Sequence, residues 1–262
     1  MAARRVDPGR AVAAVLDQAD AVLGWLSGLP PSAWRQPSAL PGWTVLELAE
    51  HVAVVLRGTP EVLARATADK PMSVAGYLAG YAARADAIRE REVAAAAGRD
   101  PAEVLAGIYA GREAVAAAVL PAVPAARAVQ GGRGPVTPAD YLLTRVVELV
   151  VHADDLSRSR PDREPVELDR GALRLATQGL ADVLAERAPG RSLELRVPPY
   201  AAVQAVAGPR HTRGTPPNVV ETDPVSWLRV AGGRLSWSEA LRTGSVRASG
   251  ERADLTPWLP LL

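Results

Sequence analysis

The stretch RVVELVVHADDL, residues 145–156, sets a glutamate and a histidine four positions apart in a run of valines and leucines. On a helix this spacing places Glu148 and His152 on one face, one turn apart. The flanking residues are apolar nearly all round, so we expect the pair to be buried. A buried carboxylate needs a nearby cation or hydrogen-bond donor. Arg145 can supply that charge. Glu148 and His152 are therefore either a hydrogen-bonded pair in the core or part of a metal site.

The charge balance and the residue content limit the class of protein. Lysine and arginine total 30 against 29 acidic residues, so the composition does not indicate a nucleic-acid or anionic-lipid partner. The chain has no cysteine, which excludes disulfides, thiolate metal sites and a cysteine nucleophile. The first 24 residues lack the apolar stretch of a signal peptide, and no run is long enough to span a membrane. We therefore expect a soluble, cytoplasmic protein.

The first two-thirds of the chain predict helices separated by proline and glycine. Thr44 and Glu47 form a capping-box pattern, and Thr137 precedes Pro138 as a helix cap. The segment 121–135 is expected to be a loop because it is rich in proline and glycine. Together these helices are typical of an antiparallel bundle. The predicted helices cover residues 9–27, 44 to about 58, 73–97, 101–119 and 137–159.

The pattern changes after residues 157–169. A helix over 169–188 is followed by RSLELRV and YAAVQAVAG, which are expected to be strands paired through Pro198 and Pro199. Two short helices and a last strand, SVRASG, complete a small α+β unit. We therefore predict two domains, a helical metal-binding bundle over 1–160 and an α+β domain over 165–262.

A second histidine strengthens the metal interpretation. In WTVLELAEHVAVVL, residues 43–56, His51 shares the face of Leu48, Val52 and Val55, which is expected to point inward. With Glu148 and His152 it gives two nitrogens and one oxygen from two helices. That donor set suits Zn²⁺ or a similar divalent ion, with a fourth position open to water or substrate. The alternative is that two of the three histidines face the core by chance.

Three segments carry a resemblance to a known family. LPGWTVLELAEHVAVV, residues 40–55, resembles the first signature helix of the mycothiol-dependent maleylpyruvate isomerase family, a branch of the DinB-like four-helix metalloenzymes. Residues 145–156 resemble that family's second signature, Arg-x-x-Glu-x-x-x-His-x-x-Asp. Residues 196–241 resemble the C-terminal sterol-carrier-protein-like domain found on many members.

The resemblance implies a fold, a metal site and an activity. The fold would be a DinB-like four-helix bundle followed by a small α+β sterol-carrier-like domain, and the ligands would be His51, Glu148 and His152. The implied enzyme is a divalent-metal-dependent, mycothiol-dependent transferase or isomerase acting on a small electrophilic metabolite. The thiol would add to a double bond, allow rotation and leave. The lack of cysteine fits a borrowed thiol, and it fits metal-activated water equally well.

A different function is open to the same sequence. The sterol-carrier resemblance also suits a carrier of lipid or another apolar ligand, in which the bundle is not catalytic. Two arginines are candidate catalytic residues in the enzymatic interpretation. Arg145 suits a substrate carboxylate or an ion pair with the glutamate one turn on. Arg213, in the loop 208–223 with His211, suits an anionic ligand near the active cleft or an exposed turn.

Two further residues have competing interpretations. Asp155, three positions after His152, is expected to orient that imidazole, to lie at a solvated helix end, or to pair with Arg158. Trp43, before the capped helix, is expected to be a hydrophobic staple rather than a stacking platform.

Overall fold

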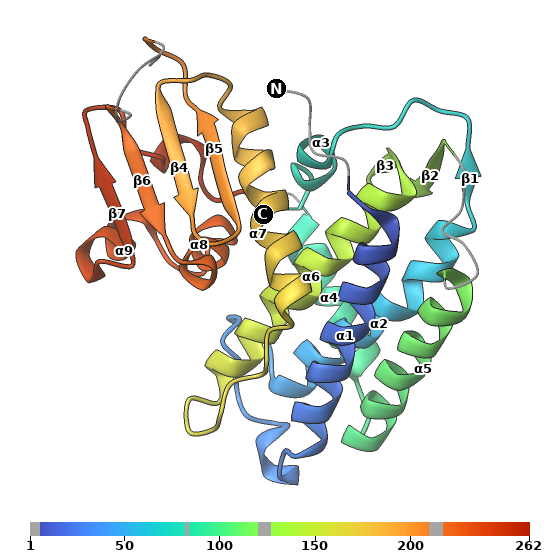
Figure 1. Ribbon diagram of the computed structural model, residues 1–262. Helices are drawn as coiled ribbons and strands as arrows, with labels where there is room; N and C mark the ends of the chain where they lie inside the picture. Colours follow the sequence, from blue (N-terminus) through green and yellow to red (C-terminus); the bar gives the residue numbers. More distant parts are fainter. Residues whose placement is uncertain (1–5, 82–83, 120–126, 210–216) are drawn as a thin grey trace. The chain divides into compact units, whose positions relative to one another are not determined.

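The computed structural model describes residues 6–81, 84–119, 127–209 and 217–262. The chain divides into two compact units (Figure 1). The larger unit comprises Val6–Ser73 and Gly80–Ala172 and is mostly helical. The smaller comprises Val74–Ala79 and Leu173–Leu262 and contains a four-stranded sheet. The predicted fold class is confirmed, and the predicted domain bounds of 1–160 and 165–262 stay a proposal.

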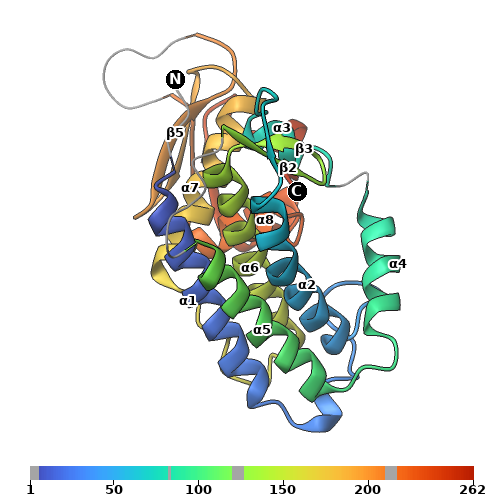
Figure 2. The ribbon, with the colours of Figure 1, turned by 90° about the vertical axis from the view of Figure 1, so that its right-hand side faces the viewer.

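Four long helices form the core of the larger unit. Helix α1 packs on α5 and α6, and α2 packs on the same two helices, so the four enclose one apolar interior (Figure 2). All four begin within one residue of where the sequence predicts, and a side-chain cap fixes the start of three of them. Asp7 caps α1, Thr44 and Glu47 form the capping box of α2, and Thr137 caps α6. The four are α1 (Pro8–Ser27), α2 (Val45–Leu63), α5 (Pro101–Val119) and α6 (Pro138–Ser159).

Helix α6 is buried on nearly every side. It contacts both α1 and α2, which explains why its sequence is apolar almost all round. Val146, Val150 and Leu156 are all fully buried within it. Burial of each such side chain stabilises the fold by about 1.5–3 kcal/mol. The polar residues on α6 are therefore held in a rigid apolar frame.

The predicted helix over 73–97 is wrong as a single element. Its residues form two helices, α3 (Val74–Leu78) and α4 (Ala85–Ala96). Helix α3 belongs to the smaller unit, whereas α4 packs on α2 in the larger one. Alanine-rich sequence favours a continuous helix, but Gly80 follows the end of α3, and glycine commonly ends a helix.

The predicted loop over 121–135 also contains regular structure. Strands β2 (Ala128–Gly131) and β3 (Gly134–Val136) form an antiparallel hairpin, and β1 (Ala66–Thr67) pairs with β2. The turn between β2 and β3 consists of Gly132 and Arg133. Gly134 has φ 131°, a value that glycine adopts readily. The glycines that suggested a loop are thus the residues that make a tight hairpin possible.

The smaller unit has the α+β arrangement that its sequence predicts. Its sheet has the order β5-β4-β6-β7, and β4 is antiparallel to β5 and parallel to β6. In β4, Leu193, Leu195 and Val197 alternate with less buried polar residues, as in a strand with one face in the core. Within the described parts of the chain, each helix is too short or too polar to cross a membrane. The elements are α7 (Arg170–Arg187), β4 (Leu193–Val197), β5 (Ala201–Ala205), β6 (Val219–Thr222), α8 (Pro224–Ala231), α9 (Trp237–Thr243) and β7 (Val246–Ser249).

Candidate metal centre

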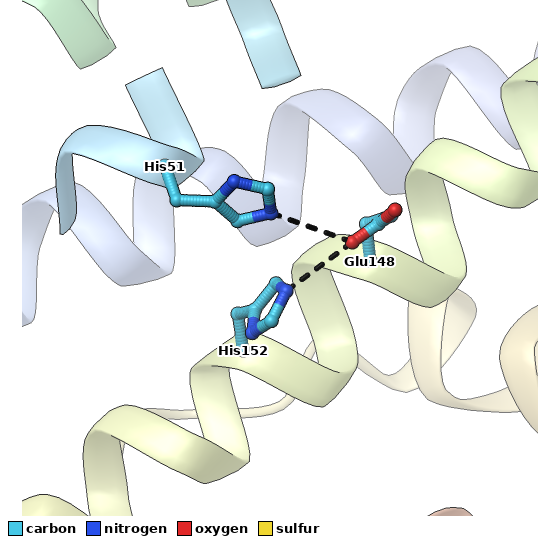
Figure 3. A group of neighbouring side chains, drawn as sticks. All are labelled: His51, Glu148 and His152. Atoms are coloured by element: carbon cyan, nitrogen blue, oxygen red, sulfur yellow. Dashed lines mark hydrogen bonds and ion pairs between the residues drawn. The ribbon is translucent and has the colours of Figure 1, made fainter. Parts of the chain in front are cut away.

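Two helices of the larger unit bring three potential metal ligands together. His51 comes from α2, and Glu148 and His152 come from α6 (Figure 3). One donor atom from each residue lies within 4.8 Å of the other two. The Oε2 atom of Glu148 is 3.6 Å from Nε2 of His51 and 3.2 Å from Nε2 of His152. The structure therefore assembles the set of residues that the sequence predicts.

Local helix signals place these side chains. The capping box fixes the start of α2, so that His51 lies less than two turns from its N-terminus. The four-residue spacing turns Glu148 and His152 to the same face of α6, and α2 and α6 are in contact. Both imidazoles are buried, with 8% of each histidine exposed. The polar cluster is thus almost completely removed from water.

Two of the three donor separations fit a tetrahedral ion. Zinc bonded to nitrogen and oxygen at about 2.0–2.2 Å places neighbouring donors roughly 3.3–3.6 Å apart. The separations of 3.2 and 3.6 Å from the Glu148 oxygen to the two histidines are close to that range, and all three donors lie within 4.8 Å of one another. Among the described residues, the cluster offers three ligands of this kind. A tetrahedral ion held by these three would have its fourth position left for water, a thiol or a substrate atom.

Glu148 is ionised and presents one oxygen to the histidines. Burial alone would raise its pKa, but the two imidazoles and Arg145 outweigh burial and hold the pKa of Glu148 well below its usual range. Its second oxygen, Oε1, accepts a hydrogen bond from the Tyr81 hydroxyl and lies 3.7 Å from the Arg145 guanidinium. Because Oε1 is engaged in this way, Oε2 is the oxygen available to a metal ion.

Tyr81 connects the carboxylate to two arginines. The guanidinium of Arg145 donates to the Tyr81 oxygen at 3.0 Å, and the guanidinium of Arg133 lies 3.5 Å from the centre of the Tyr81 ring. Burial, followed by the charge of Glu148, raises the pKa of Tyr81. The phenol therefore stays protonated at neutral pH and can donate to the carboxylate. Positive charge from two arginines accumulates on this side of the centre.

Carboxylates lie behind both imidazoles. Nδ1 of His152 is 3.1 Å from Oδ2 of Asp155, whose other oxygen accepts from Arg158 at 3.3 Å. Asp155 thus both orients the histidine and pairs with the arginine. It is fully buried, so the predicted solvated helix end is wrong. With Nδ1 engaged, Nε2 of His152 is directed at Glu148.

His51 has a comparable setting. Its Nδ1 faces Oε1 of Glu92 at 3.8 Å, and the ring of Trp43 meets its imidazole edge-on at 5.7 Å between centres. Burial alone would lower the pKa of His51, but the carboxylates of Glu148 and Glu92 outweigh it and raise the pKa to about 9. In the metal-free protein the His51 side chain is therefore mostly protonated at pH 7.

The remaining predicted site residues differ in what the structure describes. Arg145 lies at the centre and is 7% exposed. Its contact with Glu148 is the ion pair that the sequence left open as one alternative. Arg213 and His211 lie outside the described residues. Tyr81 and Glu92 are not predicted as site residues, because both fall in the segment 73–97 that the sequence predicts as one helix, and Glu92 belongs to a charged run within it.

Comparison with known protein families matches both parts of the chain. Residues 15–157 match the mycothiol maleylpyruvate isomerase N-terminal domain, and residues 169–261 match the bacterial SCP ortholog family. A search of curated proteins finds no match.

Two solved structures share the fold. The crystal structure of a mycothiol-dependent maleylpyruvate isomerase is 18% identical, with a TM-score of 0.61 and 95% of each chain covered. The crystal structure of a histidine-to-alanine mutant of such an isomerase is 16% identical, with a TM-score of 0.59 and the same coverage. The first family match covers more than half of the 262 residues and contains all three ligand candidates. This chain belongs to the mycothiol maleylpyruvate isomerase N-terminal domain family.

Proposed function

We propose that this chain is a divalent-metal-dependent enzyme that uses mycothiol to isomerise a small electrophilic metabolite of the maleylpyruvate type. The metal ligands in this proposal are His51, Glu148 and His152. One observation carries it: two buried histidines and a half-buried glutamate from two helices converge inside the segment that matches the isomerase family. Two imidazoles and a carboxylate favour Zn²⁺ among the common divalent ions.

The thiol in this proposal comes from outside the chain. The sequence contains no cysteine, so the protein has no thiol of its own to add to a double bond. A bound divalent ion would supply the positive charge that lowers the pKa of a thiol at the open position. The sulfur adds to one alkene carbon, the resulting single bond rotates, and the sulfur leaves as the double bond forms again. No electrons or protons are gained or lost overall.

The chain's own residues bind and orient in this scheme. Arg145 is the candidate for a substrate carboxylate, because its planar guanidinium can donate two parallel hydrogen bonds. It is held beside the centre by its hydrogen bond to Tyr81. Arg213 is proposed as a second anion-binding residue. Burial of the two histidines and Arg145 limits contact with bulk water, which strengthens the interactions of Arg145.

The proposal is tested by the dependence of the reaction on thiol. Purified protein loaded with zinc is mixed with maleylpyruvate, and loss of the cis double bond is followed by absorbance with and without mycothiol. We expect conversion above background only when mycothiol is present. Heat-denatured protein with the same zinc and thiol provides the control. Zinc-dependent turnover of a substrate without any thiol would instead indicate metal-activated water and a hydrolytic enzyme.

A second candidate function has one specific observation behind it. Residues 169–261 match the bacterial SCP ortholog family, which suits a carrier of an apolar ligand. Native mass spectrometry of freshly purified protein tests this function directly. A copurified lipid supports carriage, and a mass equal to the chain plus metal counts against it.

Metal binding should release a proton from His51. Because the pKa of this side chain is about 9 in the metal-free protein, an incoming ion must displace a proton at any lower pH. Apparent zinc affinity should therefore rise about tenfold per pH unit from pH 7 and level off near pH 9. Calorimetry at pH 7.5, in buffers with different ionisation enthalpies, should show about one proton released per ion. An affinity that stays constant between pH 7 and 8.5 would contradict this expectation.

A further inference from the structure

The buried face of α4 carries a glutamate. Among the described side chains of this helix, Glu92 is fully buried and Ala96 is 3% exposed, whereas the others are half-buried or exposed. Glutamate is almost never fully buried unless it is paired. The most buried position of an otherwise solvated helix is therefore occupied by a carboxylate, which needs a polar partner.

Glu92 faces the back of a proposed metal ligand. Its Oε1 is 3.8 Å from Nδ1 of His51, across the contact between α4 and α2. Within the described residues, the buried Nδ1 makes no hydrogen bond, and neither does the buried Oε2 of Glu92. Each unsatisfied buried group costs about 1–3 kcal/mol. A movement of about 1 Å would bring Nδ1 and the carboxylate to a normal hydrogen-bond distance.

The neighbouring arginine does not account for the burial. Arg91 donates to Oε1 of Glu92 at 2.7 Å, but 67% of the Arg91 side chain is exposed. An ion pair with an exposed partner contributes little to stability. Burying a carboxylate costs more free energy than such a pair returns. A second partner on the buried side is therefore required, and Nδ1 of His51 is the polar atom that faces it.

The other histidine, His152, has a carboxylate behind its Nδ1 at hydrogen-bond distance. Nδ1 of His152 is 3.1 Å from Asp155, which is also fully buried. In both cases a carboxylate stands behind Nδ1, and Nε2 is directed at Glu148. Glu92 is not itself part of the ligand cluster, because it faces the ring nitrogen on the opposite side.

We infer that Glu92 is a positioning residue that accepts a hydrogen bond from Nδ1 of His51 and so directs Nε2 of His51 at the metal centre. The inference rests on the proposed metal site and extends it to a third helix, α4. Carboxylates of this kind fix the tautomer and the orientation of a ligand imidazole, and their loss typically weakens metal binding 10- to 100-fold.

The test compares zinc affinities of full-length variants by competition with a chromogenic chelator. Glu92→Met removes the acceptor and keeps the length of the side chain, whereas Glu92→Gln keeps an acceptor oxygen without the charge. We expect Glu92→Met to bind zinc about 10- to 100-fold more weakly and Glu92→Gln to recover part of that loss.

Glu50 provides a matched control. It is adjacent to His51 in the sequence and equally buried, but its carboxylate accepts hydrogen bonds from Arg57 and Arg99. Glu50→Met should lower the melting temperature and leave zinc affinity unchanged. An equal loss of affinity in Glu50→Met and Glu92→Met would overturn the inference, since it would show general loosening of the bundle.

The zinc affinity of the wild-type protein distinguishes failure of this inference from failure of the proposed function. Wild-type protein that binds no zinc would overturn the proposed metal centre and the inference with it. Wild-type protein that binds zinc no better than Glu92→Met would overturn the inference alone. Should Glu92→Met fail to fold, nitrogen NMR of the zinc-loaded wild type decides. A proton on Nδ1 of His51 supports the inference, and zinc coordinated through Nδ1 overturns it.

Discussion

Replacing His152 by alanine is expected to weaken zinc binding by roughly 100- to 1000-fold. Zinc sites with four protein ligands bind with about 10–16 kcal/mol, so one ligand contributes about 2.5–4 kcal/mol. The loss should be at the upper end here, because Asp155 and Glu148 would both lose a partner on the side of the missing imidazole. Chelator competition on purified protein measures the affinity, and elemental analysis should fall from about one ion per chain to near zero.

A buried polar residue outside the ligand cluster provides the control for that experiment. Gln18 is fully buried in the same unit, where its amide donates to the carbonyl of Glu167 and accepts from the backbone of Asp169. Gln18→Ala should destabilise the bundle and leave zinc affinity unchanged. If His152→Ala and His51→Ala both retain the wild-type affinity, these histidines do not bind the metal and the enzymatic proposal fails.

The sequence could predict the ligand set because local signals determine it. A capping box fixes the start of α2, and a four-residue spacing on an apolar helix fixes two side chains of α6. Each signal lies within one helix, so it does not depend on how the rest of the chain folds. The proximity of His51 to Glu148 follows from these signals only if the apolar faces of both helices point to a common core.

The groups around the ligands could not be predicted in the same way. Tyr81 lies in the break between α3 and α4, in a segment whose alanine content predicts a continuous helix. It reaches Glu148 through tertiary packing, with 67 positions between them in the chain. Glu92 belongs to the charged run REREV, which has the composition of a solvated helix face. No periodicity links either residue to the centre.

Arg145 shows where a single pattern supports two roles. The three-residue spacing to Glu148 predicts an ion pair, and the position beside a metal site predicts a substrate-binding residue. The structure contains the ion pair at 3.7 Å, which is longer than a hydrogen bond, together with a direct hydrogen bond to Tyr81. The ion pair is thus observed, whereas binding of a substrate carboxylate by Arg145 stays a proposal.

Removal of the metal is expected to abolish activity while the bundle stays folded. Without an ion, Glu148 still has four partners, namely Tyr81, Arg145, His51 and His152. The frame of α6 is apolar and does not depend on the centre. Zinc at a hundredfold excess over its dissociation constant should add only about 2.7 kcal/mol of stability. For a protein of this size that corresponds to a rise in melting temperature of roughly 5–10 °C.

Activity should respond far more strongly than stability. The charge of a bound ion stabilises a reacting group by several kcal/mol, which corresponds to a loss of about a thousandfold in rate when the ion is removed. Dialysis against a chelator, followed by circular dichroism and the isomerisation assay, measures both effects. Readdition of zinc should restore turnover, and chelator already saturated with zinc provides the control. A chain that unfolds on chelation would instead have a structural site, because only a closed four-ligand centre contributes its binding energy to folding in that way.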